Sequence, residues 1–128
     1  MKPGENTNQG FGIHVAKEYS EIKGFIESYS RDDSNSSLRT CIVQKYIHNP
    51  LLIHRRKFDI RTYAMLTSIN GNLKGYTYEE GYLRTSCGVY NTKNLANRTV
   101  HLTNDAVQKQ SEDYGKFESG NKLGYTDF

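Results

Sequence analysis

Apolar residues recur on one face of a stretch near the start of the chain. Four of them lie at positions i, i+3, i+4 and i+7, namely Ile22, Phe25, Ile26 and Tyr29. This spacing predicts an amphipathic helix over residues 17–29, interrupted at Gly24. Just before it, the Ile-His-Val at residues 13–15 predicts a short strand.

The next regular pattern is rich in β-branched residues. Residues 41–47, CIVQKYI, predict a strand that stops at the His-Asn-Pro of residues 48–50, because proline cannot donate to strand pairing. The run LLI at residues 51–53 then resumes the extended chain. Between the helix and this strand, residues 30–38 are almost all polar, which indicates an exposed connector.

A β-hairpin is the strongest local prediction. Asn70-Gly71 separates two strand-like runs within residues 57–86, and both residues tolerate the positive φ that a tight turn requires. Alternation along the first strand predicts a core face made of Phe58, Ile60, Ala64 and Leu66. The opposite, polar face carries Lys57, Asp59, Arg61 and Tyr63.

The returning strand predicts a second polar row beside the first. Its members occupy every other position: Lys74, Tyr76, Tyr78, Glu80, Tyr82 and Arg84. Two interpretations stay open. Alternating charge on a strand is usually a solvated face whose ion pairs contribute about 0 to 1 kcal/mol each. Alternatively, several charges directed at one region of two adjacent strands form a clamp around an anionic ligand.

Composition limits the size of any core. The 128 residues suffice for one domain, yet 35% of them are hydrophobic and none is tryptophan, so we expect a thin core. The net charge of +3 favours an anionic ligand or an acidic protein partner over duplex DNA, whose binders usually carry a concentrated basic stripe. The basic run at residues 54–57 lacks a stacking platform, so we expect no nucleic-acid partner.

Spacing disfavours other classes of site. Cys41 and Cys87 are isolated, and the four histidines show no metal-ligand spacing. We therefore assign no metal ligand within the chain. The sequence shows neither a signal-peptide pattern nor an apolar run of membrane length. We expect a reducing, cytoplasmic compartment and no membrane partner.

A glycine-rich segment, KPGENTNQGFGI, occupies residues 2–13. It matches neither a Walker A loop nor a dinucleotide-binding fingerprint. Even so, Gly10 and Gly12 lack side chains, so their backbone N–H groups could approach a phosphate closely, and Lys2 would add a positive charge. The alternative is a flexible polar tail, and the segment alone does not decide between the two.

Six blocks follow one another in an order that resembles the tubulin-tyrosine ligase family: KPGENTNQGFGI, VQKYIHNPLLI, RKFDIRTY, YEEGYLRTS, VHLTNDAVQK and DYGKFESGNKL. This resemblance implies an α+β fold, a partial ATP-grasp fold whose antiparallel sheet has flanking helices. It also implies that residues 1–128 are the central part of a catalytic domain that is incomplete at both ends. The upstream lobe, and the acidic and Glu-x-Asn ligands of Mg²⁺, would then lie outside the chain.

The resemblance further implies which residues would bind ATP. Lys2 would contact the phosphates, and the flap, which we define as residues 8–12 and which contains Gly10 and Gly12, would close over them. Lys57 and Asp59 would contact phosphate and ribose. The hinge, which we define as the segment beside the adenine, would consist of Gln44, Lys45, Tyr46 and Ile47.

For the reaction, the resemblance implies ligation of a free amino acid to the C-terminal tail of tubulin through an acylphosphate. Arg61 and Arg84 would be the catalytic residues, because guanidinium groups neutralise the oxygen charge that develops in phosphoryl and acyl transfer. Arg84 would also bind substrate, together with Thr103 and Asn104. The motif combination favours tyrosine as the added amino acid, with glutamate and glycine left open.

Partners and location follow from the same resemblance. We expect ATP and Mg²⁺ as cofactors, the tubulin tail and a free amino acid as substrates, and a monomer. The location would be the cytoplasm in association with the cytoskeleton, with the cilium or basal body as a candidate site. The alternative is a catalytically incomplete fragment that binds nucleotide or tubulin.

Overall fold

The computed structural model describes residues 1–4, 7–30 and 40–128 and is an α+β structure. Its strands are β1 (Lys2–Pro3), β2 (Cys41–Ile42), β3 (Leu52–Ile53), β4 (Arg56–Arg61), β5 (Ala64–Ile69), β6 (Asn72–Thr77), β7 (Tyr82–Val89) and β8 (Lys122–Gly124). Its helices are α1 (Tyr19–Ser30), α2 (Arg98–His101) and α3 (Asp105–Gln108), with 3-10 turns η1 (Ser119–Asn121) and η2 (Tyr125–Asp127). The predicted connector, residues 30–38, lies outside the described residues from residue 31 onward.

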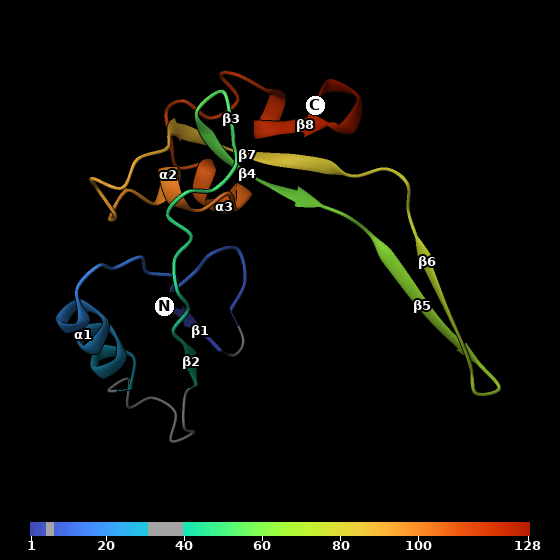
Figure 1. The fold of residues 1–128 in the computed structure, drawn as a ribbon, viewed down its shortest axis with the longest axis horizontal. Coiled ribbons are helices and arrows are strands. Elements are labelled where there is room, and N and C mark those ends of the chain that lie inside the picture. Colours follow the sequence, from blue (N-terminus) through green and yellow to red (C-terminus); the bar gives the residue numbers. More distant parts are fainter. Residues whose placement is uncertain (5–6, 31–39) are drawn as a thin grey trace.

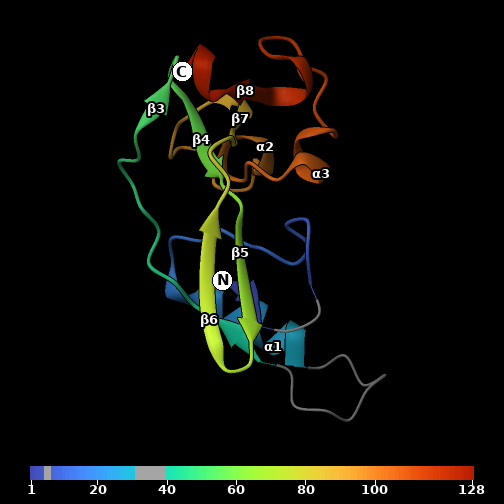
Figure 2. The same cartoon turned by 90° about the vertical axis from the view of Figure 1, so that its right-hand side faces the viewer.

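The strands form three antiparallel sheets. The largest has the order β3-β4-β7-β8, and the pairs β1-β2 and β5-β6 form two small sheets. The four-stranded sheet and the short helices α2 and α3 lie together, whereas β1, β2 and α1 lie at the N-terminal end of the structure (Figure 1). The β5-β6 pair extends away from both groups (Figure 1), and in the view turned by 90° it lies in front of the N-terminal part (Figure 2).

Strand β7 is the centre of the core. Leu83 is fully buried on it and Cys87 is nearly so, while Val100 of α2 and Val107 of α3 are buried as well. Both short helices contact β7. In the described residues these four are the only buried hydrophobic side chains, which confirms the expected thin core. Burial therefore concentrates where β7 meets the two helices.

The amphipathic helix is confirmed as α1, which begins two residues later than predicted. Its four predicted apolar residues are half-buried, and its other described side chains are exposed. The Glu21 carboxylate accepts hydrogen bonds from the backbone N–H groups of Lys17 and Glu18, at 3.0 and 3.1 Å. These bonds satisfy donors that a helix start otherwise leaves free. The helix thus begins at a side-chain cap.

Two strand predictions are corrected. Residues 13–15 form no strand; instead the backbone groups of His14 and Met1 exchange two hydrogen bonds, of 2.8 and 2.9 Å, which close the glycine-rich segment. The predicted strand at 41–47 is reduced to β2 because β1 offers it only two partner residues. The run LLI is confirmed as extended chain, since it contains β3.

The Asn70-Gly71 hairpin is confirmed. Both residues have positive φ, 51° and 79°, and six residue pairs join β5 to β6. A second two-residue turn, His54-Arg55, joins β3 to β4 with φ of 47° and 64°. The sequence does not predict this turn, because neither residue is the glycine or asparagine that normally adopts positive φ.

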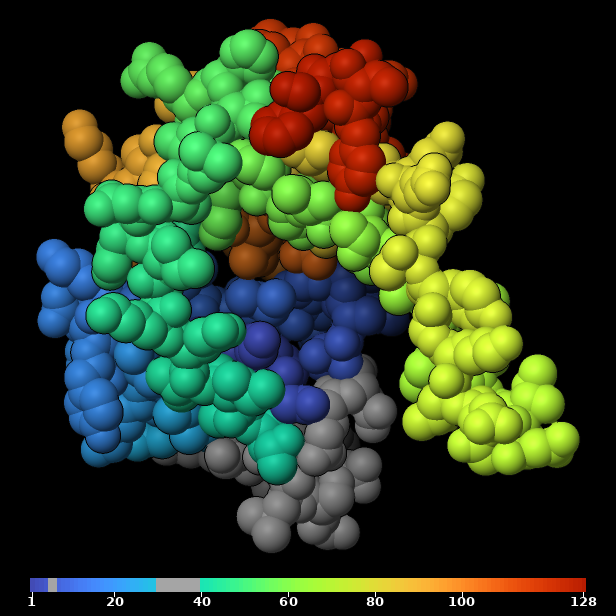
Figure 3. Space-filling view, turned by 45° about the vertical axis from the view of Figure 1, so that its right-hand side comes forward, coloured from blue at the N-terminus to red at the C-terminus, as the bar shows by residue number. Residues whose placement is uncertain are grey.

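The predicted core face of the hairpin is wrong at three of its four residues. Ile60 and Leu66 are 54% and 72% exposed, and Ala64 is exposed too. The cause is a break after Arg61: β4 pairs with β7, whereas β5 pairs only with β6. The β5-β6 pair consequently projects beyond the body, with open space between it and the N-terminal residues (Figure 3).

The prediction of one continuous polar row on the returning strand is also wrong, because of the same break. Its members separate onto two strands, with Lys74 and Tyr76 on β6 and Tyr82 and Arg84 on β7, while Tyr78 and Glu80 lie between the strands. Members of the two predicted polar rows are register partners between β4 and β7, where Asp59 pairs with Arg84 and Arg61 with Tyr82.

Candidate functional site

The polar face of β4 and β7 brings Asp59 and Arg84 together. The two residues are directly opposite in the strand register. Arg84 Nε donates to Asp59 Oδ1 at 2.8 Å, and its Nη2 donates to Oδ2. This forked contact raises the pKa of Arg84 further, so the guanidinium stays charged. Arg61 lies two residues along β4, opposite Tyr82, and is exposed.

Lys57 lies at an irregularity of the same strand. The register shifts between Arg56 and Phe58, and the Lys57 N–H donates to the Ser86 hydroxyl at 3.0 Å. Its ammonium group donates to the carbonyl of His101 at 3.0 Å. Burial lowers the pKa of Lys57, and Asp59 opposes that shift. The bulge thus turns a lysine toward the segment that contains Thr103 and Asn104.

The hinge contacts β4 and α2 through one of its side chains. Gln44, Lys45 and Ile47 are exposed, and Tyr46 is half-buried. The Tyr46 hydroxyl lies 2.8 Å from Nδ1 of His101, and its ring centroid lies 4.9 Å from the Lys57 ammonium. The structure therefore brings one of the four predicted hinge residues against the predicted phosphate-side lysine.

The flap is seated on the start of α3. Gly10 is buried with a φ of 82°, and a Cβ on it would lie 3.0 Å from both Asn104 Oδ1 and Val107 Cγ2. Arg98 holds the flap by donating from Nη2 to the Gly10 carbonyl at 2.6 Å. A side chain at position 10 would meet both a strained backbone and occupied space. Gly10 and Asn104, predicted separately, are neighbours.

The remaining predicted residues lie in the flap, on β1 and between α2 and α3. Gly12 has a φ of 68°, and a Cβ on it would come within 2.7 Å of Pro3. Lys2 lies on β1, in a different sheet from Lys57 and Asp59. Thr103 and Asn104 are half-buried between α2 and α3.

A separate cavity of about 510 Å³ lies between the N-terminal residues and the loop before α2. Its lining includes His14 and Phe25, whose rings stack at 4.2 Å, as well as Arg98 and His101. None of the predicted site residues lines it. The polar face between β4 and β7 is therefore distinct from this cavity.

Comparison with known proteins identifies the family of this chain. A model described as "Tubulin-tyrosine ligase family" matches residues 1–125. The chain belongs to the tubulin-tyrosine ligase family.

Three relatives illustrate its place in the tubulin-tyrosine ligase family. Tubulin glycylase 3D of Tetrahymena thermophila is 45% identical over 111 residues, which cover 87% of this chain and 10% of the relative. The probable tubulin polyglutamylase ttll-9 of Caenorhabditis elegans is 37% identical, and the matched residues cover 89% of this chain and 26% of the relative. Tubulin glycylase 3B of Drosophila melanogaster is 38% identical, and the matched residues cover 86% of this chain and 13% of the relative. The chain thus spans between 10% and 26% of the length of these relatives.

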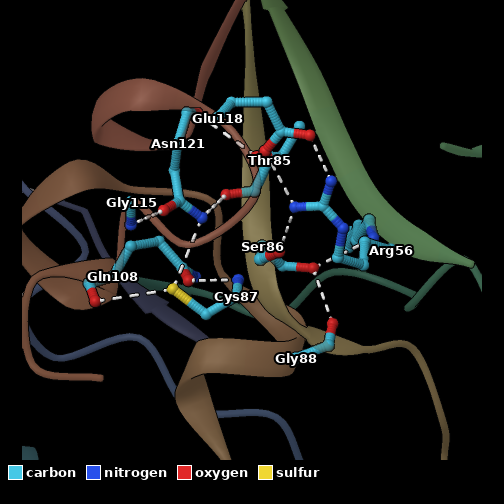
Figure 4. Close-up of polar contacts among 10 residues, drawn as sticks. Arg56, Thr85, Ser86, Cys87, Gly88, Gln108, Gly115, Glu118 and Asn121 are labelled. Carbon is cyan, nitrogen blue, oxygen red and sulfur yellow. Dashed lines mark hydrogen bonds and ion pairs between the residues drawn. The ribbon is translucent and has the colours of Figure 1, made fainter. Parts of the chain in front are cut away.

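Sequence reasoning missed the buried polar cluster of this tubulin-tyrosine ligase family member (Figure 4). Arg56 is 2% exposed, and its Nη1 donates to Glu118 Oε2 at 2.9 Å, with a second bond from Nη2 to Oε1. The Thr85 hydroxyl donates to the same carboxylate at 2.8 Å. Arg56 therefore belongs to the interior, and the basic run at 54–57 is no continuous surface patch.

Gln108 ties the two short helices to β7. Its side-chain oxygen accepts from the Cys87 N–H at 2.7 Å, and its amide nitrogen donates to the carbonyls of Thr99, at 3.1 Å, and Leu102. Asn121 donates to the Thr85 carbonyl at 3.0 Å from the other side. Every buried side-chain nitrogen or oxygen in the described residues has a partner. The only sequence signal is that Arg56 and Glu118 both fall within family blocks, since local patterns cannot pair residues 62 positions apart.

Neither a metal group nor a membrane helix is found in the described part of the chain. No three His, Cys, Asp or Glu residues there come close enough together to hold a metal ion. No helix there is both long and apolar enough to cross a membrane.

Proposed function

We propose that this chain supplies the nucleotide-binding centre of an ATP-dependent ligase, with a partial ATP-grasp fold, that adds an amino acid to the C-terminal tail of tubulin. One observation carries the proposal: the glycine flap lies directly against Asn104, with the Gly10 carbonyl held by Arg98. A flap seated on the segment predicted to hold the amino acid would bring phosphate and amine next to each other, as ligation requires.

The charges near this point suit a polyphosphate. Lys57 and Arg84 lie on adjacent strands, and Asp59 fixes the orientation of Arg84. We propose that Lys2 and Lys57 bind phosphate, that Asp59 contacts the ribose, and that the hinge accommodates the adenine. A fixed guanidinium costs little reorganisation when charge develops on a nearby oxygen. Mg²⁺ is assigned no ligand in the described residues, because no suitable group of side chains occurs there.

The proposed reaction has two steps. First, a carboxylate of the tubulin tail attacks the γ-phosphorus of ATP, which forms an acylphosphate and releases ADP. The deprotonated amine of the free amino acid then attacks the acyl carbon, so that a C–N bond forms and the C–O bond to phosphate breaks. Arg61 and Arg84 would stabilise the oxygen charge of both transition states, and Thr103 and Asn104 would orient the amino acid.

The identity of the added amino acid is part of the proposal. The motif combination of this sequence favours tyrosine, whereas the relatives described above are named as glycylases and a polyglutamylase. Their names support tubulin as the partner and, with it, association with the cytoskeleton. We propose the cilium or basal body as a candidate location. We therefore propose that tyrosine, glycine and glutamate be compared directly.

A second candidate function applies to the 128 residues taken by themselves. Because they correspond to between 10% and 26% of the relatives' length, they would bind nucleotide or the tubulin tail without completing the ligation. This candidate predicts nucleotide binding but no amino-acid transfer.

A ligation assay tests the proposal and separates the two candidates. The 128-residue chain, and a longer natural reading frame that contains it, are each incubated with Mg-ATP, tubulin without its terminal tyrosine and one labelled amino acid. We expect transfer by the longer protein, lowered about a hundredfold by Arg84→Gln, which corresponds to about 3 kcal/mol of transition-state stabilisation. Lys74→Gln, on exposed β6, is the matched control and should retain full activity. Equal activity of the Arg84 and Lys74 variants would refute the catalytic assignment.

A further inference from the structure

His101 joins three segments that the sequence does not connect. It ends α2 and is 2% exposed. Its Nδ1 lies 2.8 Å from the hydroxyl of Tyr46, and its Nε2 lies 3.0 Å from the carbonyl oxygen of Asn94. Its own carbonyl accepts the Lys57 ammonium at 3.0 Å. Hinge, β4 and the end of α2 thus meet at one residue.

The hydrogen bonds define the state of the ring. A carbonyl oxygen only accepts, so the contact with Asn94 requires a proton on Nε2. Nδ1 of a neutral ring then accepts, and the Tyr46 hydroxyl donates to it. A neutral ring therefore has a single tautomer, with its proton on Nε2, which fixes the direction of the bond to the hinge.

The hinge depends on side-chain contacts for its position. Residues 43–47 belong to no strand, so no backbone ladder holds them. The Tyr46 hydroxyl contacts His101 and also interacts with the Tyr90 hydroxyl. Tyr90 in turn donates to the carbonyls of His48, at 2.9 Å, and Ile47, at 3.4 Å. Tyr46 also lies against the Lys57 ammonium. Loss of the His101 ring would remove one of these contacts.

We propose that His101 is a positioning residue that fastens the hinge to strand β4, through Tyr46 on its ring and Lys57 on its carbonyl. This inference rests on the proposed nucleotide site, whose adenine side and phosphate side His101 would hold at a fixed separation. His101 itself would not touch the nucleotide. Its ring would instead keep Tyr46 and Lys57 in the positions that the nucleotide meets.

Acid should loosen this arrangement. The titratable groups that contact the ring are Tyr46 on the hinge and Tyr90 after β7, and Lys57 lies near it on β4. The cavity that His101 lines also holds the charged side chains Lys17, Glu18, Glu21, Lys93 and Arg98. Burial lowers the pKa of His101, the Asn94 carbonyl opposes the shift, and Lys57 adds to the lowering. Protonation would place a hydrogen on Nδ1 and reverse the bond to Tyr46. The hinge contact should therefore weaken as the pH falls below the ordinary histidine value of about 6.5.

Four single variants of the 128-residue chain, and the double variant of His101→Phe with Tyr46→Phe, test the proposal. His101→Phe keeps an aromatic ring without nitrogen, and His101→Gln keeps one donor and one acceptor. Tyr46→Phe removes only the partner hydroxyl, so it preserves the test should His101→Phe fail to fold. Tyr76→Phe, at a half-exposed tyrosine of β6, is the matched control. The readouts are the Kd for ATP, the thermal midpoint, and hydrogen exchange at residues 43–47.

We expect His101→Phe and Tyr46→Phe to weaken ATP binding about three- to tenfold each, as the loss of one hydrogen bond predicts. The double variant should bind no more weakly than the poorer single variant, because both changes remove the same bond. His101→Gln should restore most of the affinity, and Tyr76→Phe should change nothing. Hydrogen exchange at 43–47 should accelerate in the first two variants, while exchange in β7 stays slow.

Three results would overturn the proposal. The first is a lowered thermal midpoint with an unchanged Kd, which would make His101 a purely structural residue. The second is unchanged exchange at residues 43–47 in Tyr46→Phe. An Nδ1–H tautomer in the ring ¹⁵N spectrum would be a third contradicting result. If the parent chain binds no ATP, the proposed function fails, and the exchange and ¹⁵N data by themselves decide whether His101 holds the hinge.

Discussion

At the scale of single residues, the interior of this chain depends on paired charge more than on apolar volume. Arg56 and Glu118 are 2% and 10% exposed in their side chains. The guanidinium also lies 4.3 Å from the centroid of the Phe117 ring. Burying such a charge is costly unless a partner offsets its desolvation. The pair therefore joins β4 to the segment before η1 only while both members are ionised.

Removal of the carboxylate should make this dependence measurable. The hydrogen bonds from Arg56, with a smaller contribution from Thr85, lower the pKa of Glu118. Folding thus favours the ionised form, so the pair's contribution is complete above the ordinary glutamate pKa and is lost as the pH falls through the folded value. Glu118→Gln should lower the free energy of unfolding by about 3 kcal/mol at pH 7. Urea titrations should show that this difference shrinks below about pH 4.

The matched control is an exposed pair. Lys116 and Asp113 lie 2.8 Å apart with side chains that are 61% and 50% exposed. Asp113→Asn should change the free energy of unfolding by less than about 1 kcal/mol at any pH. A Glu118→Gln deficit that is equally large at pH 3 and pH 7 would contradict the ionised pair.

At the scale of elements, turns and helix faces follow local rules. Gly24 of α1 and Gly71 of the hairpin are both exposed, and a Cβ on either would meet no atom within 4 Å. They differ in backbone, since Gly71 has a φ of 79° and Gly24 is helical. Only the helical conformation of Gly24 suits an L-residue.

This difference predicts that alanine substitutions at the two glycines change the free energy of unfolding in opposite directions. Gly24→Ala should raise the free energy of unfolding by about 0.5–1 kcal/mol, because alanine favours the helix. Gly71→Ala should lower it by about 1 kcal/mol, because alanine resists positive φ. Thermal melts of both variants measure the effect. A destabilising Gly24→Ala would contradict the helical assignment of its position.

The sequence predicted α1 and the Asn70-Gly71 turn because both are encoded within a few neighbouring residues. The sequence-based prediction was wrong where residues distant in the chain determine the local structure. Residues 41–47 have strand propensity, yet β1 is too short to pair with more than two of them. The His54-Arg55 turn was missed because β3 and β4 impose positive φ on residues that disfavour it. The blocks around Asp59 and Arg84 were found, whereas Arg98, His101 and Gln108 acquire their roles only through packing.

At the scale of the whole molecule, burial is uneven. The core around β7 is dense, whereas the β5-β6 pair projects with both faces exposed (Figure 3). Leu83 of β7 is fully buried, and Leu73 of β6 is 68% exposed. The same residue type therefore contributes very differently to stability in the two places.

A pair of leucine substitutions tests this asymmetry. Leu83→Ala should lower the free energy of unfolding by about 2–5 kcal/mol, because it removes buried methyl groups and leaves a cavity. Leu73→Ala should change it by about 0.5 kcal/mol or less. Urea midpoints of the two variants provide the comparison. Similar losses at both positions would mean that the hairpin packs against the body in solution.

The central claim is that the flap, β4 and the residues after α2 form one nucleotide site. The most direct measurement is a titration of the ¹⁵N-labelled chain with Mg-ATP, followed through its backbone amide resonances. We predict that the resonances of Gly10, Lys57, Arg84 and Asn104 shift together with one Kd, while those of β5 and β6 stay in place. Shifts confined to other parts of the chain, or different Kd values for the flap and for β4, would contradict a single nucleotide site.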